Sequence, residues 1–169
     1  MVKSNKVGLL LAVERFAPII LAGLSLILMS CSKRSIVAEF AAENWKAEGL
    51  YSAIFAWASI QIGFAFGVYG FVVGQSKGFM EAIRNTTAMN RFITYVKRAN
   101  VSSFLLTIFS IPLIVVSPDL KDPSGPEYAL VSLWFSLFVW TFLTFLRIAY
   151  GFGHLSSVKD APPFYGAGL

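Results

Sequence analysis

The amino-acid sequence predicts an all-α membrane protein, built as a bundle of four transmembrane helices. The chain of 169 residues is 56% hydrophobic and 14% charged, whereas soluble domains contain about 25% charged residues. A charge-free stretch runs from Gly49 to Ser76, which exceeds the roughly 20 apolar residues that a helix needs to cross a bilayer. Glycines recur along this stretch at helical spacing, as is typical of helices that pack closely in lipid.

Four charge-free windows near or above spanning length divide the chain. They cover residues 16–32, 49–76, 99–118 and 128–146. Helix is the expected structure, because an open strand would leave backbone groups unpaired in hydrocarbon. We expect one membrane domain over residues 1–169, with Pro18 in the first turn of the first span, where proline is tolerated.

The basic residues are unevenly distributed among the segments between the spans. The segment after the second span holds Lys77, Arg84, Arg91, Lys97 and Arg98 with a single acid, Glu81, whereas the segment after the third holds Lys121 with Asp119, Asp122 and Glu127. Because loops rich in Lys and Arg stay in the cytoplasm, we expect both termini to be cytoplasmic, in a bacterial inner membrane. The net charge of +5 is then explained by orientation and by anionic lipid, and we expect no direct binding of nucleic acid.

Two further helical segments are expected outside the spans. Residues 35–48 predict an interfacial helix on the outer leaflet, with apolar residues along one side at Val37, Phe40, Ala41 and Trp45. Residues 77–98 predict a cytoplasmic helical hairpin that breaks near Asn85-Thr86-Thr87, where Asn or Thr can cap a helix. The basic residues of this hairpin are expected to contact anionic lipid or a cytoplasmic protein partner.

The second span carries a row of small residues along one helix face. The members repeat at spacings of three, four and seven, and they are Gly49, Ala53, Ala56, Gly63, Gly67, Gly70 and Gly74. Two pairs of these glycines have the GxxxG spacing, which lets two helix backbones approach closely in lipid. We expect this row to be a helix-packing interface, and its length favours a homo-oligomer or a larger membrane complex.

Weakly polar side chains lie within the second and third spans. Gln61 is deep in the second, and Ser103, Thr107 and Ser110 form a hydroxyl row along the third. Such groups either hydrogen-bond between helices or line a path across the membrane. The central part of each predicted span lacks charged residues, which argues against ion-coupled transport.

The sequence offers little chemistry for catalysis. It contains a single histidine, His154, and a single cysteine, Cys31, and we find no nucleophile–base set, metal-ligand pattern or phosphate-binding loop. We therefore expect no enzymatic activity, no metal and no cofactor. Leu28-Met29-Ser30-Cys31 resembles the cleavage box of bacterial lipoproteins. Two interpretations of Cys31 therefore stay open, a lipidated cysteine and an ordinary cysteine at the end of a span.

These patterns favour an integral membrane subunit that acts through helix–helix association. It would assemble with itself or within a larger complex, and present its basic hairpin to lipid or to a cytoplasmic protein. A second hypothesis is a small oligomeric channel or membrane-permeabilising effector, with Gln61 and the hydroxyl row around a lumen. A third, weaker hypothesis is a carrier for a neutral or lipidic molecule.

Overall fold

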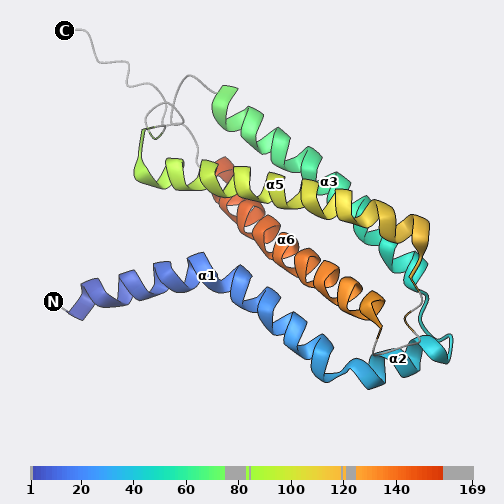
Figure 1. Cartoon of the computed structure of the whole chain (residues 1–169). Helices are drawn as coiled ribbons and strands as arrows, with labels where there is room; N and C mark the ends of the chain where they lie inside the picture. Colours follow the sequence, from blue (N-terminus) through green and yellow to red (C-terminus); the bar gives the residue numbers. More distant parts are fainter. Residues whose placement is uncertain (1, 75–82, 84, 119, 121–124, 158–169) are drawn as a thin grey trace, which may run out of the picture.

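The computed structural model describes residues 2–74, 83, 85–118, 120 and 125–157, with only the helical backbone given for residues 2–15, 156 and 157. This part of the chain is helical and contains no strand, which confirms the predicted all-α class. The helices are α1 (Val2–Cys31), α2 (Lys33–Ala41), α3 (Ala47–Gly74), α5 (Thr87–Val116) and α6 (Pro126–Ser157). The long helices lie roughly alongside one another, and α2 lies across one end (Figure 1).

Three of these helices, α3, α5 and α6, are long and apolar enough to cross a membrane. The apolar part of α1, Phe16–Cys31, rises about 24 Å, which is short of the roughly 30 Å of a hydrocarbon core. α2 follows it after a bend of 66°. A fourth span therefore depends on how the bent α1–α2 pair meets the bilayer, and the four-span topology stays a prediction.

α1 starts well before the predicted first span. It is helical from Val2, so that Pro18 lies inside the helix rather than in its first turn, and that expectation is wrong. An internal proline removes one helical hydrogen bond and clashes with the preceding turn. Prolines are a usual cause of sharp helix bends, and α1 changes direction about halfway along its length (Figure 1).

The surface helix α2 is shorter than the predicted segment 35–48. It ends at Ala41 because Glu43 adopts a left-handed conformation with φ 59°. The backbone N–H of Glu43 donates to the carbonyl of Phe40, and that of Asn44 donates to the carbonyl of Glu39, both at 3.1 Å. These two bonds form a Schellman motif, which stops a helix, and they leave Trp45 outside α2.

The start of α5 agrees with the predicted break near Asn85-Thr86-Thr87. Thr86 is extended, and its hydroxyl accepts a hydrogen bond from the backbone N–H of Met89 at 3.2 Å. This is a helix N-cap, which satisfies one of the unpaired N–H groups of the first turn. The other side of the expected hairpin, residues 75–82 and 84, lies outside the described part of the chain.

The last helix continues past the predicted span end at Leu146. α6 begins at Pro126 and runs to Ser157, and the proline at its first position needs no N–H partner there. The helix continues through Arg147, whose guanidinium carbon lies 3.5 Å from the centroid of the Tyr95 ring on α5. A cation over an aromatic face is stabilised by the ring quadrupole.

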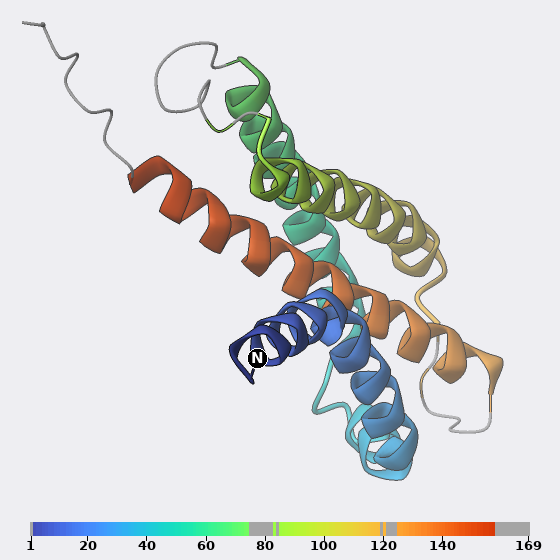
Figure 2. The ribbon, with the colours of Figure 1, turned by 90° about the vertical axis from the view of Figure 1, so that its left-hand side faces the viewer.

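The helices run up and down, so that their ends gather at two poles. The C-terminal end of α3, the N-terminal end of α5 and the C-terminal end of α6 share one pole, and α2 lies at the other (Figures 1 and 2). α3 pairs most extensively with α5, and α6 packs against both α5 and α1. A buried cluster lies toward each pole, one around Tyr51, Leu106 and Trp134 and the other around Val68, Val96 and Ile148.

Small residues line the buried sides of α3 and α5. α3 buries Ala58 and Ala65, and α5 buries Ala99, Ser102 and Ser103. Small side chains allow two helix backbones to approach closely in lipid. The close pairing of α3 with α5 therefore uses alanine and serine, and the glycine row has no part in it.

We expect Ala65→Leu to destabilise the bundle, because extra methylenes in a closely packed seam typically cost about 1–3 kcal/mol. The matched control is Ala56→Leu on the same helix, where the side chain is exposed. Thermal unfolding in a detergent that keeps the chain monomeric should show a lower midpoint for Ala65→Leu alone. Equal midpoints for the two variants would show that the seam is not tightly packed.

Candidate functional site

The row of small residues on α3 lies on the open side of that helix. Gly49, Ala53, Ala56, Gly63, Gly67, Gly70 and Gly74 are all exposed. A Cβ atom built at each of these five glycines meets nothing within 4 Å in the described structure. Within the described part of the chain, no helix packs against this face.

The side of α3 that faces the bundle is nearly opposite the glycine face. Its buried residues recur every three or four positions and are Tyr51, Ile54, Ala58, Gln61, Ala65, Val68 and Val72. With 3.6 residues per turn, these positions form a single stripe. The stripe that packs within the chain thus combines alanines with larger residues such as Ile54 and Val68, and the glycines are left on the surface.

The polar residues of the predicted spans lie between helices inside the single chain. Gln61 is 1% exposed, and its amide Nε2 donates to the backbone carbonyl of Thr141 on α6 at 3.4 Å. Ser110 is fully buried and accepts a hydrogen bond from Nε1 of Trp134 at 2.9 Å. Ser103 and Thr107 instead donate to carbonyls of their own helix, at Ala99 and Ser103.

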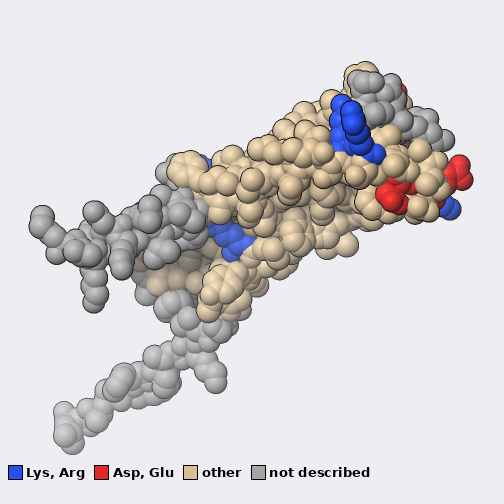
Figure 3. Space-filling view, turned by 90° about the horizontal axis from the view of Figure 1, so that it is seen from below, with Lys and Arg blue, Asp and Glu red and all other residues tan. Residues whose placement is uncertain are grey.

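The basic residues that were predicted to meet lipid or a partner are described only in part. Arg91, Lys97 and Arg98 are exposed near the start of α5, whereas Lys77 and Arg84 lie outside the described residues. The Nζ atom of Lys97 lies 5.9 Å from the centroid of the Tyr69 ring. Charged side chains appear toward the two ends of the molecule, with a broad uncharged band between them (Figure 3).

Neither the cysteine nor the histidine belongs to a reactive cluster in the described structure. Cys31 is an exposed free thiol at the end of α1. The His154 ring meets the Tyr150 ring edge to face, with 4.5 Å between centroids. Within the described residues, no group of three or more His, Cys, Asp or Glu side chains could hold a metal ion.

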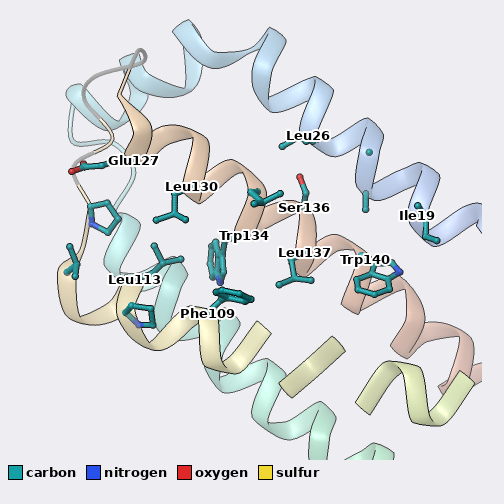
Figure 4. A pocket seen from close by; sticks show the side chains of 16 residues that line it. Ile19, Leu26, Phe109, Leu113, Glu127, Leu130, Trp134, Ser136, Leu137 and Trp140 are labelled. Carbon is teal, nitrogen blue, oxygen red and sulfur yellow. The ribbon is translucent and has the colours of Figure 1, made fainter. Parts of the chain in front are cut away.

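A groove between α1, α5 and α6 was not predicted from the sequence. It has a volume of about 800 Å³ and is lined almost entirely by apolar side chains. α1 contributes Ile19, Ala22, Gly23 and Leu26, α5 contributes Phe109, Pro112, Leu113 and Val116, and α6 contributes residues from Glu127 to Trp140. Glu127 lies at one end of the groove, and Ile19 and Trp140 lie at the other (Figure 4).

The groove exists because α1 and α5 both pack against α6 but make little contact with each other. α1 is tied to α6 by two hydrogen bonds. The Tyr128 hydroxyl donates to the backbone carbonyl of Met29 at 2.7 Å, and the Ser25 hydroxyl donates to the side-chain hydroxyl of Ser136 at 3.2 Å. The spacing of apolar residues along one helix does not tell how far two other helices diverge, so the sequence carries no signal for this groove.

Arg147 is a second residue that sequence reasoning missed. It lies directly after the predicted fourth span, 128–146, and the structure holds it half-buried against Tyr95. The signal in the sequence is the apolar pattern that resumes after it, in Ile148, Ala149 and Tyr150. A basic residue flanked on both sides by helical apolar positions indicates a helix that continues.

Two buried serines on α5 give a matched test of the polar contacts. Ser110→Ala should destabilise the chain by about 1 kcal/mol, because it leaves the buried Trp134 N–H without its acceptor. Ser103→Ala should be close to neutral, because that hydroxyl bonds only within its own helix. Thermal unfolding of both variants in one detergent checks this, and equal losses would mean that the Trp134–Ser110 bond contributes nothing.

Comparison of the chain with protein-family models, with curated proteins and with solved structures finds no match. We therefore infer function from three surfaces of the chain itself: the glycine face of α3, the basic end of α5 and the groove between α1, α5 and α6.

Proposed function

We propose that the chain is an integral membrane subunit that associates with a second copy of itself through the glycine face of α3. The observation that carries this proposal is the position of the face on the surface of the chain. All seven small residues are exposed, while the other side of α3 is used for packing within the chain. A row of small residues that is open to lipid is a favourable surface for a further helix.

The length and the symmetry of the face support a second copy as the partner. The face extends from Gly49 to Gly74, a rise of about 38 Å along the helix, which exceeds the roughly 30 Å of a hydrocarbon core. Two copies related by a twofold axis each present the same surface, as in most homo-oligomers. A helix of a different membrane protein on this face is the alternative, and it would make the chain part of a larger complex.

The channel hypothesis receives less support from the geometry. A lumen between copies requires polar side chains on the surface that the copies share. Gln61 and the serines Ser103 and Ser110 lie instead in the interior of the single chain, and both serine hydroxyls are bonded to carbonyls of α5. We therefore favour association over conduction.

For orientation, we propose that the pole of the bundle that holds the start of α5 faces the cytoplasm. Arg91, Lys97 and Arg98 are exposed at this pole, whereas at the opposite pole, around α2 (Figure 1), Lys33, Arg34 and Lys46 are offset by Glu39, Glu43 and Glu48. Basic residues on the cytoplasmic side attract anionic lipid at about 1 kcal/mol per residue near the surface. The same residues are available to an acidic surface of a cytoplasmic protein.

The double substitution Gly67→Ile and Gly70→Ile should weaken self-association about tenfold, which corresponds to about 1.4 kcal/mol. The added side chains hold the partner backbone away. A Cβ atom at either position meets nothing within 4 Å in the described part of its own chain, so folding should be preserved. Mass photometry in nanodiscs measures the oligomer, and circular dichroism checks the fold.

Gly153→Ile is the control for this pair, because Gly153 is exposed on α6, away from the glycine face. It should leave the oligomer unchanged. A double variant that assembles as well as the control would remove the glycine face from the proposal. Assembly only with a different co-purifying membrane protein would replace self-association by a hetero-complex.

Replacing Arg91, Lys97 and Arg98 with Gln should reduce the retention of phosphatidylglycerol by the detergent-solubilised chain and make that retention less sensitive to salt. The control replaces Arg34 and Lys46, which are exposed at the other pole, with Gln. Native mass spectrometry over a series of salt concentrations measures the retained lipid. Equal retention in the triple variant and the control would count against a lipid-binding role for the start of α5.

A further inference from the structure

We propose that the groove between α1, α5 and α6 binds one phospholipid, with an acyl chain along α6 and an amine-bearing headgroup at Glu127. This proposal does not rest on self-association, because no residue of α3 lines the groove. The surface used by a second copy and the surface used by the lipid are therefore different parts of the chain.

The groove walls favour a hydrocarbon occupant. The side chains of Leu26, Leu113 and Leu137 face the groove, and Pro112 and Phe109 continue the apolar surface (Figure 4). Such walls offer an occupant dispersion contacts and almost no hydrogen bonds. An acyl chain makes dispersion contacts and needs no hydrogen bonds.

Two polar side chains of the groove wall, Ser136 and Trp134, already have partners in the chain. The Ser136 hydroxyl donates to the carbonyl of Ser132 at 2.9 Å and accepts from Ser25 at 3.2 Å. The Trp134 indole N–H donates to Ser110. A polar ligand would therefore lose its hydrogen bonds to water and gain none from these side chains, which is costly. An acyl chain makes no hydrogen bonds, so it has none to lose.

The length of the groove matches one leaflet of a bilayer. From Glu127 to Trp140, α6 rises about 20 Å, compared with about 15 Å for the acyl region of one leaflet. Glu127 is in the first turn of α6, at the pole near α2, where the uncharged band of the helix begins. An amphiphile with its polar end at Glu127 would therefore have its chain at the depth of that leaflet.

The charge at the mouth of the groove selects the headgroup. Glu127 is the charged side chain among the described residues that line the groove, and it is exposed. A primary ammonium can donate hydrogen bonds to this carboxylate, and charge-assisted bonds are stronger than neutral ones. Lys33 lies at the same pole, with its Nζ 6.0 Å from the centroid of the ring of Tyr128, and its charge complements the lipid phosphate.

The headgroup, rather than the acyl chain, sets the preference for this lipid over bulk lipid. Hydrocarbon tails are as apolar as leucine, so entering the groove from the bilayer brings no hydrophobic gain. We therefore expect phosphatidylethanolamine to be retained over phosphatidylcholine, which carries no N–H donor, and over phosphatidylglycerol, which carries no cation.

Gly23 gives the sharpest test, because it lies in the wall of the groove and a Cβ atom built there meets nothing within 4 Å in the described structure. Gly23→Phe should obstruct part of the groove and lower the retention of phosphatidylethanolamine about tenfold. Gly23→Ala is the matched control, since it removes the glycine but leaves the groove open. Native mass spectrometry of the full chain, given equal amounts of the three lipids in mild detergent, measures retention.

Two further variants separate the headgroup from the chain and guard against misfolding. Glu127→Gln should reduce the preference for phosphatidylethanolamine over phosphatidylcholine about fivefold. Leu133→Trp narrows the groove at a side chain that is 61% exposed, and it should act like Gly23→Phe if that variant fails to fold.

Three results would overturn the proposal. One is wild-type retention of phosphatidylethanolamine by folded Gly23→Phe and Leu133→Trp. Another is a selective loss of phosphatidylglycerol in Gly23→Phe, because that lipid does not complement Glu127. The third is a disulfide between copies through Leu130→Cys in a Cys31→Ser background, which would show a second copy in the groove.

Discussion

The close pairing of α3 with α5 is the constraint on which the rest of the structure depends. It requires small side chains where the two backbones approach, and Ala58, Ala65, Ala99 and Ser103 supply them. Once these residues face inward, the rotation of α3 about its axis is fixed. The glycines, on the other side of the same helix, then have to face outward.

α6 contacts α1, α3 and α5, and it connects α1 to the α3–α5 pair. It contacts α3 through the edge-to-face pair of Tyr51 and Trp134, whose ring centroids are 5.3 Å apart, and it contacts α5 through the Trp134–Ser110 hydrogen bond. α1 packs mainly on α6, so it is positioned by one neighbour rather than by two. A helix supported on one side leaves its other side open, and here that opening is the groove.

The sequence predicted the helical class and the break at Thr86, and three of its four predicted spans correspond to long apolar helices, because these features depend on composition and on local capping. It did not predict which face of α3 packs within the chain. Alanine and serine let helix backbones approach closely, as glycine does. Helical spacing alone therefore cannot tell which of two faces of one helix packs within the chain. The end of α2 at Ala41 was missed because its Schellman motif places a glutamate, Glu43, where glycine is usual.

The candidate surfaces also divide into features that the local sequence predicts and features that depend on packing. Exposed basic residues at the start of α5 could be predicted, since they lie in a polar segment of the sequence. The contact of Arg147 with Tyr95 and the groove beside α1 depend on how helices distant in the chain are placed, which no local pattern encodes. Gln61 and Ser110 were recognised as polar groups within spans, but only the packing assigns them their interhelical partners.

The position of α2 has a consequence for how molecules can reach the interior. Val37 of α2 is buried in the same cluster as Tyr51, Leu120 and Tyr128, so this short helix covers that pole of the bundle. Within the described residues, this cluster fills the space between α3, α5 and α6 at this pole. A lipid bound in the groove would therefore enter it sideways, by lateral partition from the surrounding hydrocarbon.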